Sequence, residues 1–144
     1  MALTEQQTDE ILEILDMYAR YYSEKNAEKI LSLVSKGISG FGSGPDEIVP
    51  DFSQFKENTR RDFGQAENIS ITFYIFRLDG QMPFAWMTAF CVIDADVGGE
   101  KMTMEGRMTA LLRNTGSRWL FEQVHFSMPY MEQFPGESFP GSAE

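Results

Sequence analysis

His125 is the only histidine in the sequence, and a hydroxyl side chain, Ser127, follows two positions later. An imidazole changes its protonation state near neutral pH, so His125 is a candidate for proton transfer. No nucleophile–base pair and no third member of a triad is visible beside it. Its predicted strand face also carries Trp119 and Phe121, which favours an alternative role in an apolar sheet surface covered by a second subunit.

Metal chemistry has little support in the composition. The chain contains one cysteine, Cys91, and one histidine, which cannot build a zinc site of the usual Cys/His type. A single cysteine also excludes an internal disulfide and favours a reducing, cytoplasmic setting. We therefore expect neither a metal nor another cofactor.

Arg107 lies in the middle of a predicted strand, where alternate residues share a face. Its neighbours depend on the register with the following strand. In one register, Arg113 pairs with Arg118 across the turn, and Arg107 then lies diagonal to Glu122. A slip of one residue groups Arg107 with His125 instead.

A guanidinium buried without a partner costs about 3–5 kcal/mol, so an inward-facing Arg107 requires compensation. One interpretation is an internal ion pair with Glu122 or Glu105. The other is a guanidinium presented to the carboxylate of a ligand. The sequence leaves both open.

Aromatic side chains with a polar atom are candidates for a pocket wall, and plain core packing is the alternative. Thr88 shares a strand face with one of them, Trp86, and would place a hydroxyl nearby. Asp46 and Glu47, in a Gly-Pro turn, are candidates for the pocket mouth or are simply solvated. The aromatic candidates are Tyr18, Tyr22, Tyr74 and Trp86.

Three predicted helices precede the strands that carry these residues. Thr4 and Gln7 form a capping box for a helix that ends near Lys25. Further caps at Asn26 and Asp51 begin helices over 27–34 and 52–63, with a short strand near Ile38 and Phe41 between them. The apolar period then changes to two, which predicts strands at 69–76, 84–94, 102–113 and 119–128.

Helices followed by an antiparallel meander predict one α+β domain over residues 1–144, with an ordered tail at 129–144. The net charge of −10 disfavours nucleic acid and anionic membrane surfaces as partners. No apolar run approaches the ~20 residues of a membrane span, and the N-terminal residues do not resemble an export signal.

The capped first helix, the short second helix, the Gly44-Pro45-Asp46-Glu47 turn and the final strand from Trp119 to Ser127 resemble the SnoaL-like domains of the nuclear transport factor 2-like superfamily. The nearest resemblance is to the association domain of calcium/calmodulin-dependent protein kinase type II. The resemblance to SnoaL-like domains implies a cone-shaped fold, in which helices close a strongly curved, mainly antiparallel sheet around a pocket. It also implies a dimer or higher oligomer.

In such domains the matching arginine points into the cavity, which favours the register that joins Arg107 to Glu122. Members that are cyclases or isomerases use an Asp or Glu as base in an apolar pocket. Glu122 is the best-placed carboxylate for that role. A salt bridge to Arg107 would hold its pKa low and make it a poor base at neutral pH.

Two main functions follow from this resemblance and from the residues, and a purely oligomeric scaffold with a vestigial cavity is a third possibility. The first is a homodimeric domain that binds a small anionic or aromatic molecule and pairs through the face of Met102, Met104, Met108, Phe121 and His125. The alternative is an isomerase, dehydratase or cyclase that uses a cavity carboxylate such as Glu122, or His125, for proton transfer. The predicted pocket residues are Arg107, Glu122, Trp86, Thr88, Tyr18, Tyr22, Tyr74 and Phe126.

Overall fold

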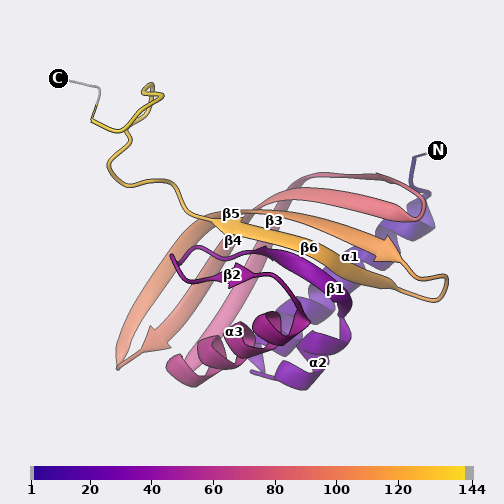
Figure 1. Ribbon diagram of the computed structural model, residues 1–144, viewed down its shortest axis with the longest axis horizontal. Helices are drawn as coiled ribbons and strands as arrows, with labels where there is room; N and C mark the ends of the chain where they lie inside the picture. Colours follow the sequence, from indigo (N-terminus) through magenta and orange to yellow (C-terminus); the bar gives the residue numbers. More distant parts are fainter. Residues whose placement is uncertain (1, 142–144) are drawn as a thin grey trace.

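The computed structural model describes residues 2–141 and has the predicted α+β architecture, with the helices on one face of a curved sheet (Figure 1). Residues 142–144 of the predicted tail lie outside the described residues. The helices are α1 (Glu5–Ser23), α2 (Ala27–Ser32) and α3 (Phe52–Gln65). The strands are β1 (Val34–Phe41), β2 (Ile48–Val49), β3 (Asn68–Gln81), β4 (Phe84–Val97), β5 (Glu100–Asn114) and β6 (Trp119–Ser127).

The predicted helix starts are confirmed by their caps. The side chain of Thr4 accepts a hydrogen bond from the backbone N–H of Gln7, and the Gln7 side chain accepts one from the Thr4 backbone. Asn26 and Asp51 accept the corresponding bonds at α2 and α3. These contacts satisfy N–H groups that have no partner within the helix.

Two predicted helix ends were wrong. Helix α2 ends at Ser32, because Val34 already belongs to β1 and is buried in the sheet. Helix α3 continues through Gly64 to Gln65, and a Cβ at Gly64 would meet no other atom within 4 Å. A side chain would therefore fit there as well, and a glycine costs a helix only about 0.5–1 kcal/mol, so Gly64 does not end it.

The six strands lie in the order β2-β1-β6-β5-β4-β3. The antiparallel meander from β3 to β6 confirms the prediction, but β1 is longer than expected and runs parallel to β6. At Gly40 the two backbones approach so closely that a Cβ would overlap the carbonyl of Val124. Glycine is thus required where the first strand joins the last.

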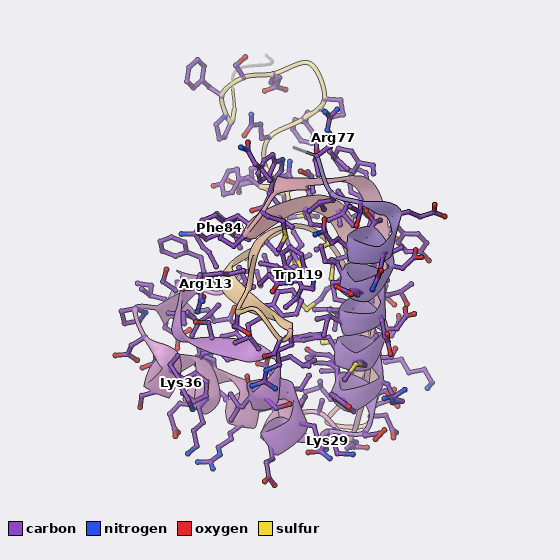
Figure 2. All side chains as sticks on the ribbon, turned by 90° about the vertical axis from the view of Figure 1, so that its right-hand side faces the viewer. Lys29, Lys36, Arg77, Phe84, Arg113 and Trp119 are labelled. Carbon is purple, nitrogen blue, oxygen red and sulfur yellow. The ribbon has the colours of Figure 1, made fainter. Side chains whose placement is uncertain are left out.

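The core fills the space between the helices and the inner face of the sheet, which we define as the face that the helices cover. Helix α1 packs against β3, and α3 packs against β1. Trp119 is 2% exposed, points toward α1 (Figure 2), and donates its indole N–H to Glu10 at 3.1 Å. Leu112 and Phe121 are also buried beside it, so this end of the domain is closed by packing.

The predicted pairing of Arg113 with Arg118 was wrong. Arg113 pairs with Leu120, and a bulge leaves Glu122 as an extra residue on β6. An inserted residue turns every side chain beyond it to the other face of the strand. Arg107 consequently pairs with Ser127 on the outer face, the face without helices, where it shares a groove with His125.

Residues 128–141, which follow β6, lead away from both layers (Figure 1). The hydrogen bonds described for this segment lie within it, for example from the Gln133 backbone to Tyr130 and from the Gln133 side chain to Ser138. Tyr130 is 57% exposed and Phe134 is 60% exposed. Neither aromatic side chain is therefore anchored on the body of its own chain.

Candidate functional site

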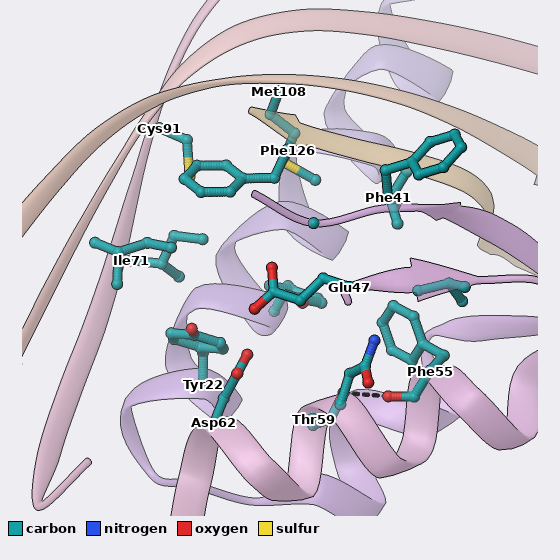
Figure 3. Close-up of a pocket in the computed structure, with 16 residues that line it drawn as sticks. Tyr22, Phe41, Glu47, Phe55, Thr59, Asp62, Ile71, Cys91, Met108 and Phe126 are labelled. Atoms are coloured by element: carbon teal, nitrogen blue, oxygen red, sulfur yellow. Dashed lines mark hydrogen bonds between the residues drawn. The ribbon is translucent and has the colours of Figure 1, made fainter. Parts of the chain in front are cut away.

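A cavity of about 140 Å³ lies between the inner face of the sheet, helices α1 and α3, and the chain around Glu47 (Figure 3). Most of its wall is apolar, contributed by the strands and by aromatic rings. The polar side chains in the wall are Tyr18, Tyr22, Glu47, Asn58, Thr59 and Asp62.

Asp62 is the most unusual group of the cavity. Its carboxylate has no hydrogen bond and no ion pair within the part of the chain that the structure describes. Burial, and secondarily the charge of Glu47, raises its pKa to about 6, although Arg61 acts in the opposite direction. Helix α3 supplies this side chain from the same face as Phe55 and Phe63, which are buried.

Glu47 is held differently from Asp62, although both line the cavity. Its carboxylate accepts a 2.9 Å hydrogen bond from the backbone N–H of Gly44 and lies 3.3 Å from the guanidinium of Arg61. The same guanidinium lies 2.7 Å from Asp46, and this hydrogen bond holds the pKa of Asp46 below its ordinary value. Arg61 thus joins the loop that carries Asp46 and Glu47 to helix α3. Its guanidinium is occupied by these two carboxylates and does not line the cavity.

Tyr18 and Tyr22 provide neutral hydroxyl groups beside the Asp62 carboxylate. Their rings stack at 6.0 Å, and burial, with the Asp62 charge as a smaller cause, raises both pKa values above the ordinary range. Within the described residues neither hydroxyl has a hydrogen-bond partner. Both therefore remain protonated at neutral pH and can donate to a bound molecule.

Cys91 also lines the cavity but does not supply a nucleophile. Burial raises the pKa of its thiol to about 12, and only a thiolate is strongly nucleophilic. Within residues 2–141 no group of three His, Cys, Asp or Glu side chains is arranged to hold a metal ion. The chemistry available in the cavity is consequently that of Asp62 and the tyrosines.

Three predicted pocket residues, Tyr18, Tyr22 and Phe126, line this cavity, and their role in binding stays a prediction. Glu122 does not line it, because the bulge turns its side chain toward Arg113, whose Nε lies 3.4 Å away. The other predicted residues point from the outer face, since they occupy the opposite set of alternating positions in β3, β4, β5 and β6. These residues are Tyr74, Trp86, Thr88, Arg107 and His125.

The sequence interpretation missed Asp62 altogether. A signal was present in the spacing, because Phe55, Thr59 and Asp62 recur at helical intervals and share one face of α3. An acidic residue on an otherwise buried helix face is uncommon unless it is paired or functional. Glu47 was considered for the pocket mouth, and the structure places it in the wall.

The fold, a six-stranded curved sheet covered by three helices, is that of the nuclear transport factor 2-like superfamily. A family model described as SnoaL-like domain matches residues 11–131, so the chain belongs to the SnoaL-like domain family. Comparison with curated protein sequences gave no match. The nearer resemblance to the kinase association domain stays a prediction.

Solved structures with the same fold include proteins named as enzymes. A candidate scytalone dehydratase from Novosphingobium aromaticivorans has a TM-score of 0.77 and 11% identity, with 84% of this chain and 83% of that chain covered. A candidate dehydratase of the NTF2-like family from Streptomyces avermitilis has a TM-score of 0.79 and 12% identity, over 88% and 98% of the two chains.

A nuclear transport factor 2-like superfamily protein from Salmonella enterica has a TM-score of 0.76 and 17% identity, with 91% of this chain and 96% of that chain covered. At such identities the similarity shows the fold alone. No helix among residues 2–141 is long and apolar enough to cross a membrane.

Proposed function

We propose that this chain is a proton-transfer enzyme of the isomerase or dehydratase kind, in which Asp62 is the acid–base group. The observation that carries the proposal is a carboxylate with a pKa of about 6 and no partner among the described residues, in a largely apolar cavity. A structural ion pair would have satisfied that charge. This favours the second of the two predicted functions over simple binding, with Asp62 in place of Glu122 or His125.

The chemistry follows from the positions of the three polar groups. The Asp62 carboxylate takes a proton from a C–H next to a carbonyl, and the electron pair moves onto the carbonyl oxygen. A hydroxyl of Tyr18 or Tyr22 donates a hydrogen bond to that oxygen and stabilises its developing charge. Protonated Asp62 then returns the proton either to another carbon, which gives an isomer, or to a departing hydroxyl, which leaves as water.

The substrate that fits is small, neutral and cyclic. Two carboxylates, Asp62 and Glu47, line the cavity, and no lysine or arginine among the described residues does, so an anionic ligand is disfavoured. A volume of about 140 Å³ is close to that of a cavity of ~150 Å³ known to accept benzene. The aromatic part of the ligand prediction is retained, and the anionic part is not.

Two structural neighbours named as candidate dehydratases support the reaction class without identifying the substrate. The single cysteine is buried and free, which supports a cytoplasmic setting as part of this proposal. The net charge of −10 repels nucleic acid and anionic membranes, so neither is proposed as a partner.

The test uses 3-cyclohexenone, a neutral single-ring ketone whose double bond moves into conjugation on proton transfer. We expect the wild-type chain to accelerate this isomerisation, with a rate that rises as pH passes through about 6, because the base must be ionised. Asp62→Asn should reduce the rate by about 10²–10⁴-fold. Asp46→Asn, at the exposed end of the arginine pair, is the matched control and should change it only a few-fold. An Asp62→Asn variant as active as the wild type would contradict the proposal.

Assembly as a homodimer through the sheet is the second part of the proposal. The predicted methionine face cannot be the interface, because Met108 and Phe121 are buried inside the domain. The outer face instead exposes a contiguous group of aromatic side chains, and a patch of this kind marks an interaction surface. These residues are Tyr74, Phe76, Phe84, Trp86 and Phe90.

A further inference from the structure

The segment 128–141 exposes apolar side chains that its own domain does not cover. Met131 is 82% exposed, and Tyr130 and Phe134 are more than half exposed. The segment nevertheless has a defined local path, with backbone hydrogen bonds at Gln133 and Glu137. Figure 2 shows it standing clear of the helices and the sheet. A cluster of uncovered apolar side chains of this kind marks a surface that binds a partner.

The outer face of the sheet offers such a surface, which we call the outer groove. It has a volume of about 400 Å³ and is lined by Phe76, Thr88, Phe90, Arg107, His125 and Ser127. The rings of Phe76 and Phe90 lie 5.4 Å apart and are both more than half exposed. Arg107 is exposed and has no hydrogen bond or ion pair within the described residues.

We infer that residues 128–141 of one copy dock in the outer groove of a second copy, so that the dimer exchanges its C-terminal segments. The groove combines aromatic rings with Arg107 and His125, whereas the segment combines aromatic rings with Glu132 and contains neither lysine nor arginine. Aromatic rings therefore occur on both surfaces, and the positive charge of Arg107 is opposite to the negative charge of Glu132. The inference rests on the proposed homodimer and not on the proposed catalysis.

The geometry favours a second copy over the chain's own groove. The segment starts at the end of β6, beside its own groove at Ser127, and leads away from the helices and the sheet (Figure 1). A second copy whose outer face meets this one would offer its groove to a segment that leads away from its own body. At about 3.3 Å per residue the segment can extend about 40 Å, more than the ~15–20 Å across four neighbouring strands.

A crosslinking experiment distinguishes a segment that docks on a second copy from one that folds back onto its own chain. Full-length protein carrying Phe134→benzoylphenylalanine is prepared with natural nitrogen and with nitrogen-15, mixed, irradiated and digested. We expect crosslinked peptides that join a light copy to a heavy copy, with attachment on the outer face of β3, β4 or β5. Leu12→benzoylphenylalanine, another exposed apolar position, is the control and should give no such product. Crosslinks within one copy only, or none above the control, would overturn the inference.

Sedimentation at several protein concentrations gives an independent readout. Removal of the residues after Pro129 should weaken dimerisation at least tenfold while leaving circular dichroism of the body unchanged. Phe134→Asp should also weaken it, whereas Ser138→Asp, at an exposed position of the same segment, should have a much smaller effect. A truncated chain that dimerises as tightly as the full chain would refute segment exchange and leave the sheet dimer standing. A full chain that is monomeric at high micromolar concentration would refute both.

Discussion

The inner and outer faces of the same strands differ in what covers them. On β4 and β5 the inner positions, such as Ala89, Cys91 and Met108, lie under the helices and are almost fully buried. The outer positions between them carry Trp86 and Phe90, which are about half exposed. Both faces are apolar, so composition alone does not distinguish a cavity wall from an interface. The difference shows that the face covered by the helices encloses the cavity, whereas the uncovered face remains available to a partner.

The two tryptophans provide the strongest test of this contrast. Trp119→Ala should lower the free energy of unfolding by about 3–5 kcal/mol, because it empties part of the core and removes the hydrogen bond to Glu10. Trp86→Ala, on the outer face, should cost the monomer less than about 1 kcal/mol.

Urea unfolding at two protein concentrations separates the effects. The Trp119→Ala loss should not depend on concentration, whereas any further loss from Trp86→Ala should, since association stabilises the native state by mass action. Equal, concentration-independent losses would show that the outer face is not an interface.

The pH dependence of stability tests the inner cavity. The folded-state pKa of Asp62 is about 6 against an ordinary value of 3.8, so the folded state binds this proton more tightly than the unfolded chain does. The resulting stabilisation is present below about pH 4 and is lost as pH rises to about 6, by at most ~3 kcal/mol. Asp62→Asn should therefore be more stable than the wild type at pH 7, with no such advantage near pH 4.

Asp46→Asn serves as a control with the opposite sign. Its hydrogen bond to Arg61 lowers the pKa of Asp46, so the stabilisation is present at neutral pH and lost as pH falls. Thermal unfolding from pH 7 down to about pH 2 measures both variants, because the Asp46 contribution is lost only below its ordinary pKa of 3.8. An Asp62→Asn curve parallel to that of the wild type would mean that the carboxylate is solvated or paired in solution.

The smallest effect is expected at Arg107. Because this side chain is exposed and makes no ion pair within the described residues, Arg107→Met should change the stability of the monomer by only about 0.5 kcal/mol. Arg61→Met, which breaks contacts with Asp46 and Glu47, is the comparison and should lower the melting temperature more. If Arg107→Met lowered the free energy of unfolding by several kcal/mol at every protein concentration, the result would support the predicted inward orientation of Arg107 instead.

Much of the fold was predictable from local patterns. The caps at Thr4, Asn26 and Asp51 depend on residues within three positions, and the alternation of the last four strands is a property of each strand alone. The pairing of β1 with β6 was not predictable, because it joins residues such as Phe41 and His125 that are far apart in the chain.

The candidate site was only partly predictable for the same reason. Tyr18 and Tyr22 follow the helical stripe of α1, and Phe126 was grouped with the strand face that does reach the cavity. Asp62 was overlooked because its importance depends on α3 packing against the cavity, where its carboxylate lines the wall together with Glu47. The helical spacing places Asp62 on the buried face of α3, but only the tertiary structure shows that its carboxylate is partly buried without an ion-pair partner among the described residues.

The sequence by itself determined the family, the helix starts, the meander and the acidic character of the chain, because capping and apolar periodicity act over a few residues. Only the tertiary structure decided which face of the sheet is inside. A single bulged residue, Glu122, changes which residues of β6 share a face with Arg107. Arg107 lies with His125 and Ser127 on the outer face, and the helices cover the other face. The face to which a side chain points depends on every pairing that precedes it along the strand. One inserted residue therefore moves all later side chains to the other face.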